Sequence, residues 1–494
     1  MKRAFIISGI FCCSHAFAQS GIIVEYDIFP GEAGSRPHNL YVHNGKVYFF
    51  ATDTVHGYSL WSIDNSSTPS MTADVNPAAV SFPSAIPQQQ LMASYNGMLF
   101  FSAEHVDYGQ ELWMYDGANA PTMIKDMITR QNSGSPTYLT SFNNRLYFAA
   151  SDSTTPSGAE LFEYNHLNGQ VVKRSDILQA KLYSGITSVS NFDGRIVFTA
   201  FNDLTGAEVF LYDPNVKQSW MLSNIAPDNL DAYPGNYTVF NGKLYFTATD
   251  GQNGMQLYVY DGIYAPKRIS TLDLAGIHPS GLEGIMTVFN NQLYFSTAQN
   301  TIHAYNPVTG TISEVKHSNE SFTSLPRYFV VNNSKLYFSA TGNSSGSEIW
   351  SCDTMNNINA ITNMPDDNSF PAELTCIGNN IYFSAGGTSG RELYKVTDSA
   401  TTLSSLIVFD DIKIYPNPTK DISHLEINLK HIQTLELTLT DMNGRTVCKS
   451  GKVLYSAAKH TIDIPLQNLP AGTYVYSLQD ISGSRVASGK LFKQ

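Results

Sequence analysis

The chain alternates between short runs of aromatic and apolar residues and polar turns rich in Asn, Asp and Gly. One unit, a polar turn followed by an aromatic-rich strand, recurs eight times at intervals of about 48 residues. Its copies read NGKVYFFA, NGMLFFSA, NNRLYFAA, DGRIVFTA, NGKLYFTA, NNQLYFST, NSKLYFSA and GNNIYFSA. Their equivalent aromatic residues are Phe49, Phe101, Phe148, Phe198, Phe246, Phe295, Phe338 and Phe383. This period predicts a repeat architecture whose units share one fold.

Each unit contains four short strands, which the first copy shows in order: HNLYVHN, KVYFFATD, SLWSID and MTADV. Asn44-Gly45 joins the first two, and this pair favours a tight hairpin because both residues tolerate positive φ. The LYF runs lack polar alternation, which indicates strands that are buried on both faces. Four strands in about 48 residues predict one blade of a β-propeller.

The sequence favours eight blades, with seven as the alternative. The sixth copy is the uncertain one, because its loop is cut to AQNTIHAYNP. Residues 22 to 28, IIVEYDI, resemble the fourth strand of a unit but precede the first unit. The last unit ends at ELYKV without an equally good fourth strand, so we expect the N-terminal strand to complete it.

A second signature follows the aromatic strand in most copies, as in YGQELWMYDG, SGAELFEYN and SGSEIWSCD. With the LYFTA strand ahead of it, the segment Glu111-Leu112-Trp113-Met114-Tyr115-Asp116-Gly117 resembles the ELWxxDGT repeat of exported bacterial proteins. The resemblance covers residues 22–397. It implies a propeller-like fold, and it supports the fold more than any function.

The repeat stops at residues 398–411, a Ser/Thr-rich segment that predicts a linker. Residues 412–494 then show short alternating strands such as HLEINL, LELTLTDMNG and GTYVYSLQD. This pattern predicts a small Ig-like β-sandwich. The whole chain is therefore expected to be all-β.

Three motifs follow one another in this second domain. The first contains Tyr415, Pro416, Asn417 and Pro418, the second contains Asp441 and Gly444, and the third contains Leu469, Gly472 and Tyr474. Together they resemble the type A sorting domain of the type IX secretion system. The resemblance implies that an outer-membrane translocon recognises the folded domain, and that the cargo is secreted or stays on the cell surface. The two prolines are expected to hold the start of the domain extended.

The first eighteen residues predict a signal peptide. Lys2 and Arg3 precede a short apolar run, and Ala16 and Ala18 form a small-residue cleavage pattern before Gln19. Lipidation at Cys12 or Cys13 is a less favoured alternative. No run reaches the roughly 20 apolar residues of a membrane-spanning helix, so no transmembrane segment is expected.

The net charge and the cysteine count limit which ligands are expected and whether disulfides stabilise the chain. The formal net charge of −12 disfavours nucleic acid as a ligand. After cleavage three cysteines remain, Cys352, Cys376 and Cys448, which excludes a disulfide framework. Free buried thiols are favoured over a single bridge between Cys352 and Cys376.

No catalytic, metal or cofactor site is assigned from the sequence. A carboxylate recurs in the second signature of five units, and we expect it to accept hydrogen bonds from turn amides: Glu111, Glu160, Glu208, Glu348 and Glu392. Calcium binding by Asp53, Asp152 and Asp250 is the less favoured interpretation, because no contiguous acidic loop surrounds them.

The leading hypothesis is an exported, non-enzymatic binding protein whose propeller loops contact a glycan or a protein. Tyr58 and Tyr108 could stack on sugars, although packing between blades is favoured. The alternative is a polysaccharide hydrolase or lyase. That alternative requires two carboxyl groups within about 10 Å of each other in a cleft.

Overall fold

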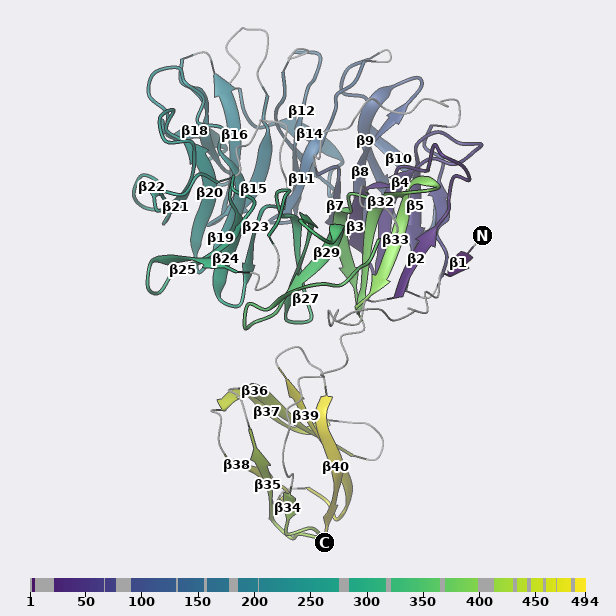
Figure 1. The fold of residues 1–494 in the computed structure, drawn as a ribbon, viewed down its shortest axis with the longest axis vertical. Coiled ribbons are helices and arrows are strands. Elements are labelled where there is room, and N and C mark those ends of the chain that lie inside the picture. The colour runs from purple at the N-terminus through teal and green to yellow at the C-terminus, as the bar shows by residue number, and fades with distance from the viewer. Residues whose placement is uncertain are drawn as a thin grey trace. The chain divides into compact units, whose positions relative to one another are not determined.

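The computed structural model describes most of the chain as two compact units, Met1–Asp398 and Ser399–Gln494. The described residues are 2–4, 22–65, 67–76, 90–129, 132–154, 158–176, 185–202, 204–274, 284–316, 321–364, 369–398, 413–429, 433–441, 446–455, 459–467, 469–480 and 485–494. All regular elements in them are β-strands (Figure 1). They accordingly include no helix long and apolar enough to cross a membrane.

The described part of the first unit forms eight antiparallel sheets, numbered here in chain order. Sheets 1 to 4 contain β3 (His38–His43), β4 (Lys46–Ala51), β5 (Ser59–Ile63) and β6 (Ser70–Ala73); β7 (Met92–Tyr95), β8 (Met98–His105), β9 (Gly109–Tyr115) and β10 (Thr122–Lys125); β11 (Thr137–Phe142), β12 (Arg145–Ala150), β13 (Glu160–Asn165) and β14 (Gln170–Lys173); and β15 (Ser188–Phe192), β16 (Arg195–Asn202), β17 (Gly206–Asp213) and β18 (Gln218–Ser223).

Sheets 5 to 8 continue the same order. They contain β19 (Gly235–Phe240), β20 (Lys243–Thr249), β21 (Met255–Tyr260) and β22 (Lys267–Arg268); β23 (Met286–Phe289), β24 (Gln292–Ser296), β25 (Ile302–Asn306) and β26 (Thr311–Val315); β27 (Arg327–Asn332), β28 (Lys335–Gly342), β29 (Gly346–Cys352) and β30 (Ile358–Ala360); and β31 (Ala372–Ile377), β32 (Asn380–Gly387) and β33 (Gly390–Thr397), which β2 (Ile22–Tyr26) and β1 (Lys2–Ala4) extend. The shortened sixth copy thus forms a four-stranded sheet.

The local turn prediction is confirmed. Asn44 and Gly45 join β3 to β4 with φ of 46° and 77°, and both turn residues have positive φ in sheets 1 to 7. The eight equivalent phenylalanines are all fully buried, each with 0% of its surface exposed. A side chain that large, when fully buried, contributes roughly 1.5–3 kcal/mol relative to an exposed one.

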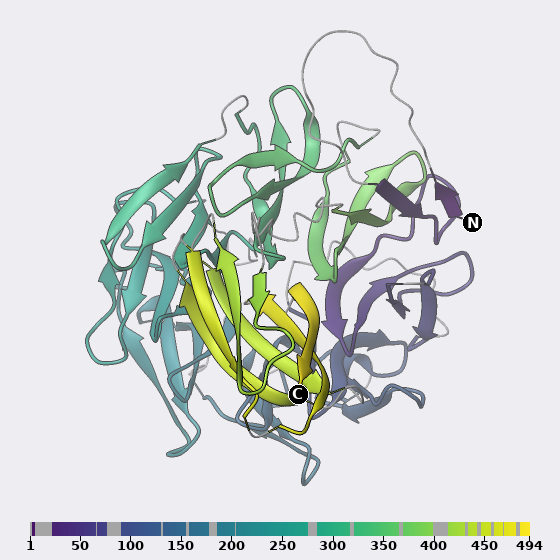
Figure 2. The ribbon, with the colours of Figure 1, turned by 90° about the horizontal axis from the view of Figure 1, so that it is seen from below.

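Each hydrophobic core of the first unit lies between neighbouring sheets rather than inside one sheet. Tyr48 of sheet 1 and Phe101 of sheet 2 share one cluster, and Tyr382 of sheet 8 shares another with Phe49 of sheet 1. The first strands follow the same order, because each contacts the first strand of the next sheet and β31 contacts β3. Figure 2 shows these sheets following one another around a common centre.

The N-terminal strand pairs with the last sheet, as the sequence predicts. β2 lies antiparallel to β33, with Ile22 opposite Thr397 and Tyr26 opposite Leu393. The short β1 pairs with the outer edge of β2. The predicted cleavage residues Ala16, Ala18 and Gln19 lie outside the described residues, so the signal peptide stays a prediction.

The recurring carboxylates have the structural role expected of them. Glu392 lies in β33 and accepts hydrogen bonds from the amides of Ile28 at 3.1 Å, Phe29 at 3.2 Å and Ser35 at 2.8 Å. It thereby ties the segment after β2 to the last sheet. The other four each accept a hydrogen bond from the segment that follows the fourth strand of the same sheet. The donors are the amides of Gly134, Ala226 and Met364 and the hydroxyls of Ser175 and Thr362.

The second unit contains two sheets that share one core. One sheet holds β34 (Lys413–Tyr415), β35 (Ile422–Asn428) and β38 (Lys459–Pro465); the other holds β37 (Thr446–Tyr455), β36 (Gln433–Asp441), β39 (Gly472–Asp480) and β40 (Arg485–Lys493). Leu425 and Ile464 of the first sheet pack with Leu437 and Leu478 of the second. The predicted sandwich is therefore present. The predicted linker lies outside the described residues except for Asp398.

Replacing Glu392 tests how strongly the N-terminal segment is held. We expect Glu392→Ala to lower the free energy of unfolding of the first unit by about 2–4 kcal/mol, because several buried donors lose their acceptor. Glu32→Ala changes an exposed carboxylate of the same segment and is the control. Thermal unfolding of both variants measures the difference, and equal midpoints would contradict the assigned role.

The buried carboxyls also predict a pH dependence. Burial raises the pKa of Glu111 to about 7, against hydrogen bonds that act in the opposite direction. An acid with a raised folded-state pKa favours folding below its unfolded pKa, and this contribution is lost as pH rises through the folded value. Stability of the wild type should therefore fall between about pH 4.5 and 7 relative to Glu111→Gln. The measurement is the unfolding midpoint of the wild type, of Glu111→Gln and of the exposed control Glu104→Gln across this pH range. The same pH dependence in the wild type and in Glu111→Gln would contradict the prediction.

Candidate functional site

The first strands of five sheets carry the same irregularity. Each contains a register shift against its second strand, at a residue five positions before the tight turn. These residues have φ between 55° and 58°, and they are Asn39, Tyr138, Asn236, Tyr328 and Glu373. Asn adopts this conformation readily, whereas for Tyr or Glu it costs on the order of 1 kcal/mol. A repeated local strain must be offset by an interaction.

Two of these side chains accept a hydrogen bond from the next sheet. The amide of Leu40 donates to Oε2 of Glu373 at 3.3 Å, which links sheet 8 to sheet 1. The amide of Leu91 donates to Oδ1 of Asn39 at 3.1 Å, which links sheet 1 to sheet 2. Both bonds fix the orientation of the accepting side chain.

At two other boundaries between sheets, a backbone carbonyl is the acceptor instead of a side chain. Leu139 donates to the carbonyl of Gln90 at 3.1 Å, and Phe329 donates to the carbonyl of Gly284 at 2.8 Å. A Cβ on Gly284 would lie 2.8 Å from Cα of Tyr328, so this position requires glycine. Neighbouring first strands are thus linked by a backbone acceptor at some boundaries and by a side-chain acceptor at others.

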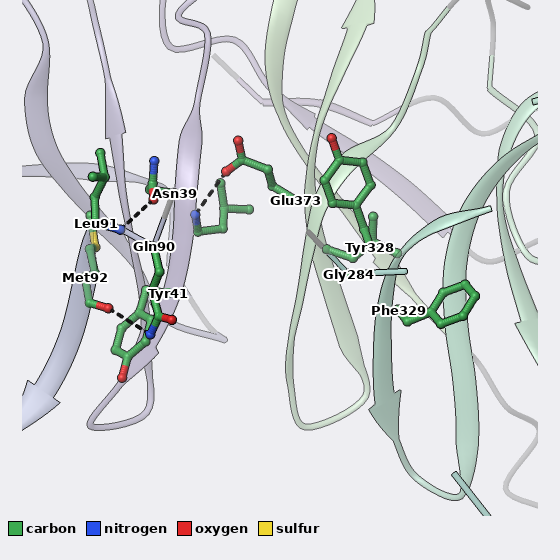
Figure 3. Close-up of a pocket in the computed structure, with 11 residues that line it drawn as sticks. Asn39, Tyr41, Gln90, Leu91, Met92, Gly284, Tyr328, Phe329 and Glu373 are labelled. Atoms are coloured by element: carbon green, nitrogen blue, oxygen red, sulfur yellow. Dashed lines mark hydrogen bonds between the residues drawn. The ribbon is translucent and has the colours of Figure 1, made fainter. Parts of the chain in front are cut away.

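A cavity of about 240 Å³ lies where these strands begin (Figure 3). It is lined by residues of sheets 1, 2, 7 and 8, by residues just before β7, and by Gly284 just before β23: Asn39, Leu40, Tyr41, Gln90, Leu91, Met92, Gly284, Tyr328, Phe329, Glu373 and Leu374. Two of the lining rings also pack or bond elsewhere, since Tyr41 accepts a bond from the Ser94 amide and Phe329 packs against Phe338. The lining also includes the polar side chains of Asn39, Gln90, Tyr328 and Glu373.

Glu373 determines the charge of this cavity. Burial raises its pKa to about 7, although the amides of Asn39 and Leu40 and the nearby Arg391 favour the ionised form. Arg391 itself donates to the carbonyls of Ser384 and Phe370, each at 3.1 Å. Near neutral pH this carboxyl can therefore both accept and donate a hydrogen bond.

The residues that the sequence offered as alternative sites lie elsewhere. Oδ1 of Asp53 accepts from the Val55 and His56 amides, and Asp250 binds the Gln252 and Asn253 amides in the same way. Asp152 similarly accepts from Thr154. The described residues hold no cluster of three potential metal ligands. These aspartates stabilise their own loops.

The described aromatic and thiol candidates are mostly enclosed. Tyr58 packs edge-on against His38 with ring centroids 4.9 Å apart, whereas Tyr108 is 38% exposed and leans on His105. Cys352, Cys376 and Cys448 are free thiols, as favoured from the sequence. Burial raises the pKa of Cys352 and of Cys376 to about 12, so both stay protonated at neutral pH.

The motifs of the second unit converge on its last strand. The side chain of Asn417 donates to the Lys490 carbonyl and accepts from the Phe492 amide, both at 2.9 Å. The Tyr474 hydroxyl donates to the Pro470 carbonyl at 2.7 Å. Asn417 thus ties the start of this unit to its end.

The remaining motif residues have varied surroundings. Leu469 packs against the core, Gly472 begins β39 and Asp441 ends β36, while Gly444 lies outside the described residues. The expected extended start is wrong, because the chain bends at residues 416–418 and both prolines follow cis peptide bonds.

No sequence motif singled out the polar residues of the cavity. Three of them, Asn39, Tyr328 and Glu373, share one signal, because each lies five positions before a tight turn. The repeat conceals it because the residue type changes from copy to copy. Residues more than 330 positions apart also become neighbours here, and no local pattern encodes that.

Comparison with known families identifies the second unit. Residues 413–493 match the secretion system C-terminal sorting domain. A search of curated proteins gives no match to the chain.

Solved structures show distant similarity. PorZ, an essential bacterial surface component of the type-IX secretion system of Porphyromonas gingivalis, is 14% identical over 94% of this chain and 70% of its own, with a TM-score of 0.39. A puromycin hydrolase is 12% identical, covering 84% and 62%, with a TM-score of 0.49. A Mycobacterium tuberculosis puromycin-hydrolyzing peptidase is 10% identical, covering 76% and 62%, at 0.48. The chain spans less than two thirds of both hydrolases, and at these scores the similarities say nothing about its function.

The family match therefore indicates where the protein is located. The chain carries a type IX sorting tail at residues 413–493 and is a secreted or outer-membrane-surface protein.

Proposed function

We propose that this chain is an exported binding protein, in which a closed eight-bladed propeller of ELWxxDGT-like repeats holds a ligand in its central cavity. The observation that carries this proposal is the composition of the cavity wall, to which four sheets and the segment before β23 contribute residues. A cavity of this kind, partly apolar with a few fixed polar groups, is typical of ligand sites.

Three observations support a closed ring. Four strands recur in each of eight sheets, β31 contacts β3, and one hydrophobic cluster joins sheet 8 to sheet 1. β2 brings the N-terminal end of the unit into its last sheet, which would pin the ring through main-chain hydrogen bonds.

The cavity chemistry favours binding over the alternative of a polysaccharide hydrolase or lyase. Glycosidases use two carboxyl groups on opposite sides of the scissile bond. Among the described lining residues, Glu373 supplies the single carboxyl group. We therefore assign the side chains of the cavity to recognition.

Export follows in two proposed steps. The signal peptide of residues 1–18 would carry the chain across the inner membrane, and the folded sorting domain would then engage the type IX translocon. Neither step needs a transmembrane helix in the mature chain.

Deleting residues 412–494 tests the export step. In cells that possess the type IX system, the full chain should appear in the medium or on the cell surface, and the truncated chain should stay inside the outer membrane. Fractionation followed by immunoblotting measures the distribution. A reporter that carries the signal peptide and residues 399–494 is the converse control. Normal release of the truncated chain would overturn the assigned role.

Filling the cavity tests the binding function. Gln90 is exposed and lines the cavity, so Gln90→Trp should occupy the space without disturbing a core. Gln218→Trp places the same indole at an exposed position of β18, outside the lining. On arrays of saccharides and of peptides, the full wild-type chain and Gln218→Trp should share bound probes that Gln90→Trp loses. Binding that survives in Gln90→Trp would remove the cavity from the proposal.

A further inference from the structure

The size of the cavity limits what can enter it. Its volume of about 240 Å³ lies below the roughly 300–1,000 Å³ of pockets that hold drug-sized molecules. With about 30 Å³ for each water in the liquid, it corresponds to a small cluster of waters. A single ring or one side chain of a larger ligand fits this space.

The polar groups at the cavity are fixed before any ligand arrives. Oδ1 of Asn39 is held by the Leu91 amide, and Oε2 of Glu373 is held by the Leu40 amide. In Figure 3 the amide of Asn39, the carboxyl of Glu373 and the hydroxyl of Tyr328 point in the same direction. Side chains oriented in advance lose little entropy on binding.

These groups match hydroxyls better than a single charge. An amide, a phenol and a carboxyl whose pKa is raised to about 7 can each donate and accept hydrogen bonds. Alcohol groups also donate and accept, so a polyol can pair with all three. The ring of Tyr328 adds an apolar face with a polar tip, and Leu91 and Met92 are among the lining residues.

The backbone of the wall disfavours an extended peptide. Strand addition needs a regular edge with its amides and carbonyls in register. β3, β27 and β31 each carry a register shift and a left-handed residue at the cavity. In addition, the amides of Leu40, Leu91 and Phe329 already bond to neighbouring sheets. Recognition must therefore come from side chains.

We propose that the cavity binds one sugar ring at the end of a saccharide, with Asn39 and Glu373 bonding to its hydroxyls and Tyr328 covering its apolar face. This proposal rests on the proposed binding function and specifies the ligand class. The rest of the saccharide extends out of the cavity, because the volume admits one ring.

The variants that test it preserve the backbone. Asn39→Gly removes the amide group but keeps a residue that tolerates positive φ, and Tyr328→Asn removes the ring on the same principle. Asn236→Gly is the matched control, because Asn236 has the same φ of 55° and residue type in sheet 5 but lies outside the lining. It too loses one hydrogen bond, which its amide donates to Thr247. Glu373→Gln keeps an acceptor for the Leu40 amide.

The full chain is screened on an array of defined saccharides and on a peptide array, and bound probes are titrated by calorimetry. We expect saccharides to bind, and Asn39→Gly and Tyr328→Asn each to weaken binding by about tenfold or more. Asn236→Gly should bind like the wild type. Glu373→Gln should bind within a few-fold of the wild type if hydrogen bonding rather than charge is used.

The outcomes separate the two proposals. Peptides that bind in place of saccharides, and are weakened by the cavity variants, would overturn the ligand class and leave the binding function standing. Saccharide binding that is equal in wild type, Asn39→Gly and Tyr328→Asn would overturn the sugar site in this cavity. Failure of both arrays to show binding would overturn the binding function itself.

Discussion

The first unit depends on one constraint: a small twisted sheet with two apolar faces cannot fold alone. Each of its eight sheets buries aromatic side chains against the next sheet, so every hydrophobic core lies at a boundary between repeats. Stability is then a sum of similar interfaces. The two sheets furthest apart in sequence must also meet, because otherwise Phe49 and Tyr382 would face water. That last contact is made by β31 against β3 and by the hydrophobic cluster that joins Tyr382 to Phe49. The pairing of β2 with β33 and the bonds of Glu392 add the N-terminal segment to the last sheet.

The same constraint accounts for the cavity. Neighbouring sheets are held at the start of their first strands by backbone bonds at some boundaries and by side chains at others. At two boundaries the acceptor is a side chain, that of Asn39 or of Glu373. Both residues have a positive φ, which costs conformational energy. Both also line the cavity, so residues that link neighbouring sheets are among those that a ligand would contact.

The two units carry different functional features. The second unit has its own core and its own sheets, and Asn417 ties its first residues to its last strand. It carries the match to the sorting domain. The first unit carries the cavity.

The sequence alone determined the repeat, the four strands in each unit, the Asn-Gly hairpins, the burial of the equivalent phenylalanines and the sorting motifs. These are local or periodic properties: positive φ favours Asn and Gly, and strands buried on both faces must be apolar. It also predicted the pairing of β2 with the last sheet. The chain has a strand before its first repeat, and its last repeat lacks a fourth strand. The bend at residues 416–418 was missed, since proline fixes φ but leaves ψ free. Only the tertiary structure decided the cavity. Asn39 and Glu373 are separated by more than 330 residues, and their proximity follows from the stacking of whole sheets, which no short stretch of sequence records.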